Sequence, residues 1–167
     1  MNATAIVPLS KPSQKRTGEA YLKFHLGHQS YPAVFSMQHV QEVFTLSSQQ
    51  LTPMPNMPPC MLGLMNHRSR VVWVVDLALL LEINRLDITA QQYNLIVIQV
   101  GKLKLALAVP HIEGMTWLEK EHIQSPLGQT VPGLVPYLRG CILQQKEVLL
   151  VLDAAAISQA SILRNLA

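Results

Sequence analysis

Short apolar runs separated by turn residues recur along the chain, at a spacing typical of β-strands. The clearest runs lie at residues 21–26, 31–35, 60–65, 71–75, 93–100, 104–109 and 148–152. Gly27 marks a turn between the first two runs, and Gly101 with Lys102 marks another turn further along. The pattern predicts a mainly β protein that contains several hairpins.

Four segments interrupt this pattern. Apolar side chains with helical spacing predict a short helix or bend over residues 37–43. Residues 53–59 contain four prolines, which remove backbone donors and favour an extended connector over a helix or a central strand. Residues 84–92 are polar and are expected to form a loop. Residues 1–19 are polar and have little periodicity, which predicts a flexible N-terminal tail.

The second half of the chain repeats the order of features in the first half. The interval from Gly63 to Gly140 equals the interval from Asp76 to Asp153, and we call it the longer offset. Each glycine is followed by an apolar strand, a polar turn, a second strand and the aspartate. An apolar helical start then follows each aspartate, whose side chain suits the N-cap of a helix better than a role as a catalytic acid.

A second match aligns residues 39–43 with residues 111–115, and we call this interval the shorter offset. Chance similarity between apolar runs is an alternative for this match, but two offsets in the same order favour an internal duplication. The halves would span residues 20–83 and 93–157, before a short C-terminal helix. Each half has enough short runs for a small five-stranded barrel, which closes its own edges. Because a unit of about 60 residues buries little surface, two barrels are expected to pack together within residues 20–167.

The distribution of charge argues against a nucleic-acid-binding protein. The net charge is +3, but residues 20–167 contain ten Lys or Arg and nine Asp or Glu. Proteins that bind phosphates concentrate cations on one face, and aromatic side chains for base stacking make up only 5% of this chain. The longest apolar run, residues 71–81, is too short to cross a membrane. No secretory signal is visible, so we expect a cytoplasmic protein without a membrane-inserted segment.

Signatures of catalysis, cofactor binding and metal binding are missing from the sequence. There is no P-loop, no Gly-x-Ser-x-Gly elbow and no dinucleotide-binding glycine motif. His25 and His28 lie close in the sequence, but Gly27 between them would break the helix that a metal site of this spacing needs. Cys60 and Cys141 are too few for a disulfide framework or a zinc site, so two buried thiols are expected. The sequence therefore predicts a non-enzymatic protein with no cofactor.

Several ordered motifs resemble the CheW family. Residues 63–68, Gly-Leu-Met-Asn-His-Arg, with the apolar strand that ends in Asp-Leu at 76–77, resemble the signature Gly-x-x-Asn-x-Arg-Gly of that family. Other matches are the opening strand at 21–24, Val-Gln-Glu-Val at 40–43, the proline-rich segment at 51–58 and Tyr-Leu-Arg-Gly at 137–140. The resemblance spans about residues 20–157.

Three positions depart from the family pattern. Ser69 stands where the family usually has glycine, Trp73 where it often has proline, and Pro110 where an acidic residue is common. Ser69 and Trp73 lie beside the signature, so the departures point to a changed partner specificity rather than to a different fold. Trp73 alternates with apolar strand residues and is expected in the core.

The resemblance implies two SH3-like β-barrels with short helices, and a receptor tip bound near the groove between them. It also implies that barrel ends dock onto the matching regulatory domain of a CheA-type histidine kinase. The expected function is a non-enzymatic adaptor that couples methyl-accepting or photoreceptor-type transducers to this kinase in chemotaxis or phototaxis. Such an adaptor would be recruited to receptor arrays at the inner face of the membrane. A small nucleic-acid-binding β-barrel is the alternative.

The matched motifs supply five candidate partner-binding residues: Val40, Glu42, Asn66, His67 and Arg68. Arg68 has an alternative interpretation as a solvated cation at a hairpin turn. Its guanidinium group can instead form bidentate bonds with a carboxylate of a receptor helix or with Glu42. Val40 could equally be a core residue and Glu42 an exposed acid, and Asn66 could simply be a turn former.

Overall fold

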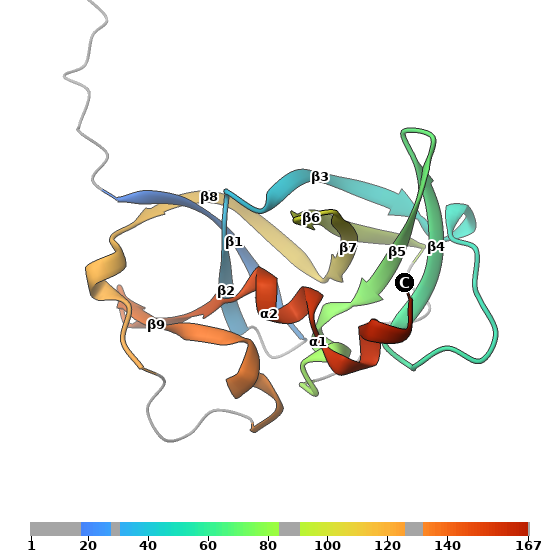
Figure 1. The fold of residues 1–167 in the computed structure, drawn as a ribbon. Helices are drawn as coiled ribbons and strands as arrows, with labels where there is room; N and C mark the ends of the chain where they lie inside the picture. Colours follow the sequence, from blue (N-terminus) through green and yellow to red (C-terminus); the bar gives the residue numbers. More distant parts are fainter. Residues whose placement is uncertain (1–17, 28–30, 84–90, 126–131, 167) are drawn as a thin grey trace, which may run out of the picture.

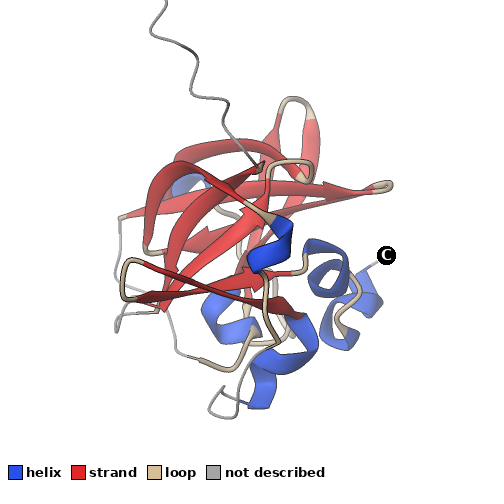
Figure 2. Ribbon diagram, turned by 90° about the vertical axis from the view of Figure 1, so that its left-hand side faces the viewer, coloured by secondary structure: helices blue, strands red, loops and turns tan. Residues whose placement is uncertain are grey.

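Two packed five-stranded sheets form the body of the molecule (Figure 1). The computed structural model describes residues 18–27, 31–83, 91–125 and 132–166. The predicted tail therefore lies almost wholly outside the described residues, as do His28 and most of the predicted loop at 84–92. Most of the short helical segments gather on one side of the strands (Figure 2). The predicted mainly β architecture of two small barrel-like units is confirmed.

The strands are β1 Glu19–Leu26, β2 Tyr31–Ser36, β3 Val40–Ser47, β4 Met61–His67, β5 Arg70–Asp76, β6 Gln92–Val100, β7 Leu103–Val109, β8 His111–Leu118, β9 Leu138–Gln144 and β10 Glu147–Leu152. The α-helices are α1 Leu77–Leu80 and α2 Ala154–Ser158. The described residues also contain four 3-10 helices: η1 Ser48–Gln50, η2 Lys120–His122, η3 Pro132–Tyr137 and η4 Ser161–Leu166.

Each sheet combines strands from both halves of the chain. One sheet has the order β3-β6-β7-β5-β4 and is called the first barrel; the other has the order β8-β1-β2-β10-β9 and is called the second barrel. The expected halves, residues 20–83 and 93–157, contain five strands each, but they exchange their opening hairpins, β1–β2 and β6–β7. Neither half forms a sheet by itself, and the exchange ties both halves into one domain.

Irregularities in strand pairing recur at equivalent positions of the two barrels. The pairing of β3 with β6 skips Gln41, and the pairing of β8 with β1 skips Glu113, its equivalent by the shorter offset. The pairing of β4 with β5 skips Leu62, and the pairing of β9 with β10 skips Arg139, its equivalent by the longer offset. The backbone therefore reproduces both offsets expected from the sequence.

A crossing of the chain closes each sheet into a barrel. In the first barrel, Thr52 follows the edge strand β3 and exchanges two backbone hydrogen bonds of 2.8 Å with Leu64 of the other edge strand, β4. In the second barrel, Gln124 follows β8 and makes the same pair of 2.8 Å bonds with Cys141 of β9. These crossings join the two free edges that each sheet would otherwise expose.

The two repeat glycines permit these crossings. A Cβ atom at Gly63 would lie 2.4 Å from the carbonyl oxygen of Thr52, and one at Gly140 would lie 2.4 Å from that of Gln124. Their φ angles of 150° and 157° are also rarely adopted by residues with side chains. The spacing of the glycines in the sequence thus marks two equivalent close approaches of backbone.

The largest apolar cluster draws on strands of both barrels, and each barrel also has a smaller interior cluster of its own. Phe24 and Phe35 stack in the shared cluster, with ring centroids 5.1 Å apart. The two aspartates of the repeat cap the helices that follow: Asp76 Oδ1 accepts from the Leu79 amide at 3.3 Å, and Asp153 Oδ1 accepts from the Ala156 amide at 3.2 Å. The predicted caps are confirmed.

Of the two forms expected for residues 37–43, the short helix is absent and the bend is present in part. Residues 37–39 form a turn, and β3 starts at Val40, opposite Ile98 of β6. Pairing with β6 overrides the helical spacing of the apolar residues in this segment, because a paired edge strand satisfies its backbone groups. Of the two thiols, Cys60 is buried and Cys141 is half-buried. Burial raises the pKa of each thiol.

Gly63→Ala is expected to lower the free energy of unfolding by about 2–4 kcal/mol, because the new methyl group meets the Thr52 carbonyl in an already restricted backbone conformation. Gly114 is the matched control, since its φ is 128° but no atom lies within 4 Å of an added Cβ. Chemical denaturation should show a smaller loss for Gly114→Ala. Equal losses would mean that backbone conformation, and not the crossing, dominates.

Candidate functional site

The end of the first barrel brings together three of the five predicted partner-binding residues, and we call this end the Arg68 mouth. The Nε2 atom of His67 lies 2.8 Å from Oε2 of Glu42. The closest approach of Arg68 to Glu42 is from Nη2 to the same oxygen, at 3.3 Å. The Glu42 carboxylate therefore links the edge strand β3 to the end of β4 and to the turn that follows.

A tight turn presents Arg68 to solvent. Arg68 and Ser69 connect β4 to β5, with φ angles of 51° and 64°. Two-residue hairpins require such left-handed conformations, which glycine or asparagine adopts most easily. Gln145 and Lys146 form the equivalent turn of the second barrel, with φ angles of 48° and 65°. The side chain of Arg68 is 74% exposed, so the turn holds its backbone while the guanidinium group projects outward.

His67 is held much more tightly than its neighbour. Its ring stacks on Phe44 of β3, with centroids 5.1 Å apart and an interplanar angle of 5°. Phe44 in turn packs against the apolar cluster inside the first barrel. The side chain of His67 is only 11% exposed, and among the described residues its buried Nδ1 atom has no hydrogen-bond partner. The packing on Phe44, which sequence reasoning missed, aims Nε2 at Glu42.

Val40 and Asn66 do not join this contact. Val40 is half-buried and packs against the shared core cluster. Asn66 is exposed and lies opposite Val71 on β5. Because neighbouring strand residues point to opposite faces, Asn66 and His67 lie on different sides of β4.

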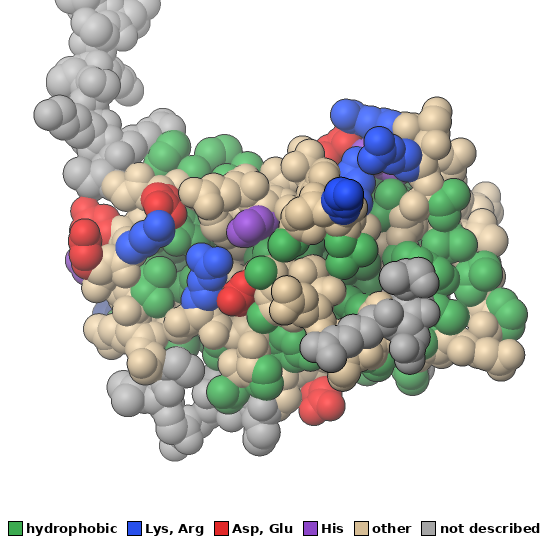
Figure 3. All heavy atoms as spheres, in the orientation of Figure 1, with side chains coloured by type: hydrophobic (Ala, Val, Ile, Leu, Met, Phe, Trp, Pro, Cys, Tyr) green, Lys and Arg blue, Asp and Glu red, His purple; other side chains and the backbone are tan. Residues whose placement is uncertain are grey.

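Further cations lie at the same end of the first barrel. The strands β5 and β7 are parallel neighbours, so the residues at their starts share one end of the sheet. The cations there are Arg68, Arg70, Lys102 and Lys104. Lys and Arg side chains gather over this part of the surface (Figure 3). Val71 and Leu103, which are 69% and 43% exposed, add apolar surface beside them.

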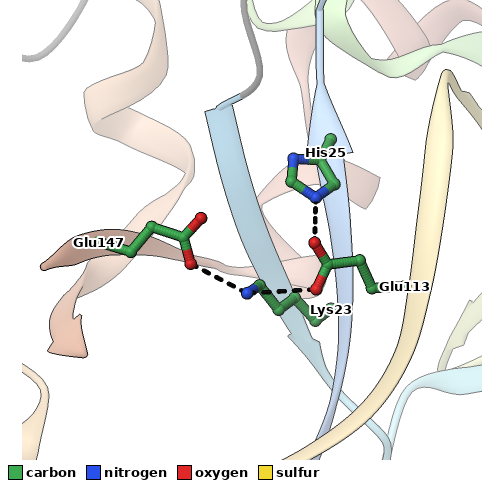
Figure 4. Close-up of polar contacts among 4 residues, drawn as sticks. All are labelled: Lys23, His25, Glu113 and Glu147. Atoms are coloured by element: carbon green, nitrogen blue, oxygen red, sulfur yellow. Dashed lines mark hydrogen bonds and ion pairs between the residues drawn. The ribbon is translucent and has the colours of Figure 1, made fainter. Parts of the chain in front are cut away.

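The equivalent end of the second barrel holds a different polar cluster, which we call the Lys23 mouth (Figure 4). Lys23 Nζ lies 3.0 Å from Glu147 Oε2 and 3.2 Å from Glu113 Oε2. His25 contacts the other oxygen of Glu113 through Nε2, and the His111 ring lies 5.4 Å from the His25 ring. Lys23 is 19% exposed, and its ammonium group bridges β8 and β10.

These contacts perturb the ionisation of the cluster. The hydrogen bond from His25, together with the ammonium group of Lys23, lowers the pKa of Glu113. Burial alone would lower the pKa of Lys23, but its bonds to Glu147 and Glu113 outweigh burial and raise it. Both groups therefore remain charged at neutral pH.

Neither mouth has the composition of a metal centre. Within the described residues, no group of three or more His, Cys, Asp or Glu side chains could hold a metal ion. No helix in the described part of the chain is long and apolar enough to cross a membrane.

Comparison with known proteins assigns the family. The model of the CheW-like domain matches residues 20–161. The chain belongs to the CheW-like domain family. Its fold is similar to the crystal structure of the scaffolding protein TtCheW from Thermoanaerobacter tengcongensis, with a TM-score of 0.73, 86% of this chain and 94% of that chain covered, and 16% identity. A comparison with curated proteins found no match.

The residues of the CheW-like signature have different structural roles in this chain. Gly63 allows the backbone crossing, and Asp76 caps α1. Arg68 projects from a turn, and its side chain is 74% exposed. The signature thus combines residues that build the barrel with one cation that the barrel exposes.

The three departures from the CheW-like pattern are accommodated locally. Ser69 adopts the left-handed conformation of the turn, where glycine would be unstrained. Trp73, which was expected in the core, is half-buried and packs against the shared core cluster. Pro110 separates β7 from β8, and its carbonyl accepts a 3.0 Å hydrogen bond from the Asn94 side chain.

Glu113→Gln should make the stability less dependent on acidic pH. Since folding lowers the pKa of Glu113 below its ordinary value of 4.5, its stabilising effect is complete above that value. The effect is lost as the pH falls through the lower pKa of the folded state. Thermal melts between neutral and strongly acidic pH should show a flatter profile for the variant.

Glu121, which is exposed on η2, provides the control. Glu121→Gln is expected to leave the acid profile of the wild-type protein unchanged. If Glu113→Gln behaves in the same way, the Lys23 mouth does not contribute to acid sensitivity.

Proposed function

We propose that this protein is a non-enzymatic adaptor that couples transducer receptors to a CheA-type histidine kinase in motility signalling. Its membership of the CheW-like family, which covers residues 20–161, is the observation that supports this function most strongly. The similar solved structure is that of a scaffolding protein. An adaptor of this kind would work in the cytoplasm, next to receptor arrays that drive chemotaxis or phototaxis.

The Arg68 mouth is the proposed receptor-binding site. The guanidinium group has five N–H donors, and a side chain that is 74% exposed leaves room for a partner to reach them. A carboxylate on a receptor helix matches the planar fork of arginine, which favours paired bonds. Glu42 lies within reach of Arg68 and is itself held by His67, while Val40 and Asn66 are proposed to border the contact.

The kinase is proposed to bind elsewhere, at barrel ends that do not include Arg68. Leu143 and Val148 face each other at the end of the β9–β10 hairpin and are 71% and 50% exposed. We propose that they form part of the kinase-binding surface, since contiguous exposed apolar surface marks docking sites. They lie on the second barrel, whereas Arg68 lies on the first, so receptor and kinase need not compete.

The four cations of the Arg68 mouth favour one alternative, a small nucleic-acid-binding barrel. Such barrels stack bases on exposed aromatic rings. Phe44, the aromatic ring at this end, is covered by His67. Binding to a single-stranded oligonucleotide that weakens steeply with salt would favour this alternative over the adaptor.

Arg68→Glu should weaken binding to a transducer by about tenfold or more, because a desolvated interface arginine contributes about 2–5 kcal/mol. Its folding should change little, since an exposed ion pair contributes about 0–1 kcal/mol, or a Tm change of at most about 4 °C. Calorimetric titration with the cytoplasmic fragment of a transducer from the same cell, together with thermal melts, measures both effects. Kinase binding should survive.

Lys146→Glu is the matched control, since it makes the same charge change in the equivalent turn of the second barrel. It should bind the transducer fragment like the wild-type protein. If Arg68→Glu melts many degrees lower, Arg68 is structural. If it binds the fragment normally, the proposed site is wrong.

Titration with ATP and magnesium should give no heat of binding. The expectation rests on the missing P-loop and dinucleotide motifs, and on the proposed role as a modulator of a separate kinase. An affinity in the micromolar range would contradict the non-enzymatic adaptor.

A further inference from the structure

We propose that His67 is a positioning residue, which holds the Glu42 carboxylate and thereby leaves Arg68 free to bind a carboxylate of the partner. This inference rests on the proposed function and concerns the same site. It assigns His67 a role in the affinity of the Arg68 mouth, separate from any direct contact with the partner.

The distances show which donor has the stronger hold on Glu42. Both His67 and Arg68 approach the same oxygen, Oε2, but His67 is closer, at 2.8 Å compared with 3.3 Å. Strong charge-assisted bonds of arginine to a carboxylate are about 2.7–2.9 Å long. Arg68 is therefore held loosely, although it lies beside an acid with which it could form a close bidentate pair.

The packing of His67 explains why it holds Glu42 more closely than Arg68 does. Its ring lies flat on Phe44 and is 11% exposed, so few other orientations are open to it. A proton on the buried Nδ1 would have no acceptor among the described residues, which places the donor N–H of the ring on Nε2, facing Glu42. Arg68 has no such constraint on its long and exposed side chain.

The hydrogen bond from His67 to Glu42 lowers the free-energy cost of binding a partner at Arg68. When a partner carboxylate draws Arg68 away, Glu42 keeps the hydrogen bond from His67. Without that bond, Glu42, which is 31% exposed, would lose its arginine and be left poorly paired near the barrel end. Glu42 would then compete with the partner for Arg68.

The second barrel indicates that the fold itself does not need this arrangement. By the shorter offset, Glu42 corresponds to Gly114; by the longer offset, His67 and Arg68 correspond to Gln144 and Gln145. These equivalent residues can form no ion pair, yet the second barrel has the same strands and the same crossing. The ion pairs at the Lys23 mouth involve Lys23, His25 and Glu113 instead, and the lysine is largely buried. The sharing of one carboxylate by a histidine and an exposed arginine therefore occurs in the first barrel.

His67→Leu and His67→Gln separate positioning from packing. Leucine keeps an apolar contact with Phe44 but cannot donate to Glu42, whereas the glutamine amide can donate in place of Nε2. In the free protein, His67→Leu should slow the hydrogen exchange of the Arg68 guanidinium group several-fold, because Arg68 closes onto Glu42. NMR of nitrogen-labelled arginine measures this exchange. His67→Gln should restore the wild-type rate, and an unchanged rate in His67→Leu would overturn the proposal.

Binding to the transducer fragment provides the second measurement. His67→Leu is expected to weaken binding about fivefold to tenfold, as a typical coupling between neighbouring groups would. His67→Gln should return the affinity to within about twofold of the wild-type value. Adding Glu42→Gln to His67→Leu should also restore binding, because the competing carboxylate is gone. A purely structural role for His67 would not be rescued by Glu42→Gln.

The outcomes distinguish this inference from the proposed function. If Arg68→Glu binds the fragment normally, the receptor site is wrong whatever His67 does. If Arg68→Glu weakens binding but His67→Leu matches the wild-type protein in both measurements, the receptor site stands and the role of His67 is refuted. A double variant as weak as His67→Leu alone would also refute it.

Discussion

The backbone crossing at Thr52 and Leu64 is the constraint on which the candidate site depends. The two hydrogen bonds of 2.8 Å bring together β3 and β4, which are opposite edges of one sheet. Glu42 lies on β3 and His67 on β4, so their contact exists because the sheet is closed. A side chain at position 63 would meet the Thr52 carbonyl, and the edges could not approach to the same extent. One glycine therefore controls both the barrel and the meeting of its charged side chains.

The sequence predicts best those features that only one or two residue types can satisfy. At Gly63 and Gly140, a side chain would collide with the backbone that crosses there. At Asp76 and Asp153, the side chain accepts a hydrogen bond from a free backbone N–H group at the start of a helix. Their common spacing therefore revealed the duplication. The exchange of the opening hairpins left no comparable signal, since the hairpin at 93–109 can pair with either half by its apolar pattern. Which sheet a hairpin joins is decided by contacts far apart in the chain.

The contacts of the candidate site could be predicted only in part. Family resemblance selects Glu42 and Arg68, and the pair between them that was one expected option is present, at 3.3 Å. The pairing of His67 with Glu42 depends on the register of β3, which skips Gln41. A bulge of this kind redirects the side chains that follow it, and nothing in the local sequence marks its position. The helical interpretation of residues 37–43 failed for another reason, because the chain from Val40 onward pairs with β6.

The two barrels show how a repeated backbone arrangement can have two chemically different ends. In the Lys23 mouth, a cation that is 19% exposed lies between Glu113 and Glu147, so its donors are used within the protein. In the Arg68 mouth, a cation that is 74% exposed shares one carboxylate with a histidine. An arriving carboxylate would have to break two ion pairs to reach Lys23, but only one long contact to reach Arg68. The two barrels share one backbone arrangement, and the positions of a few charged residues make their ends chemically different.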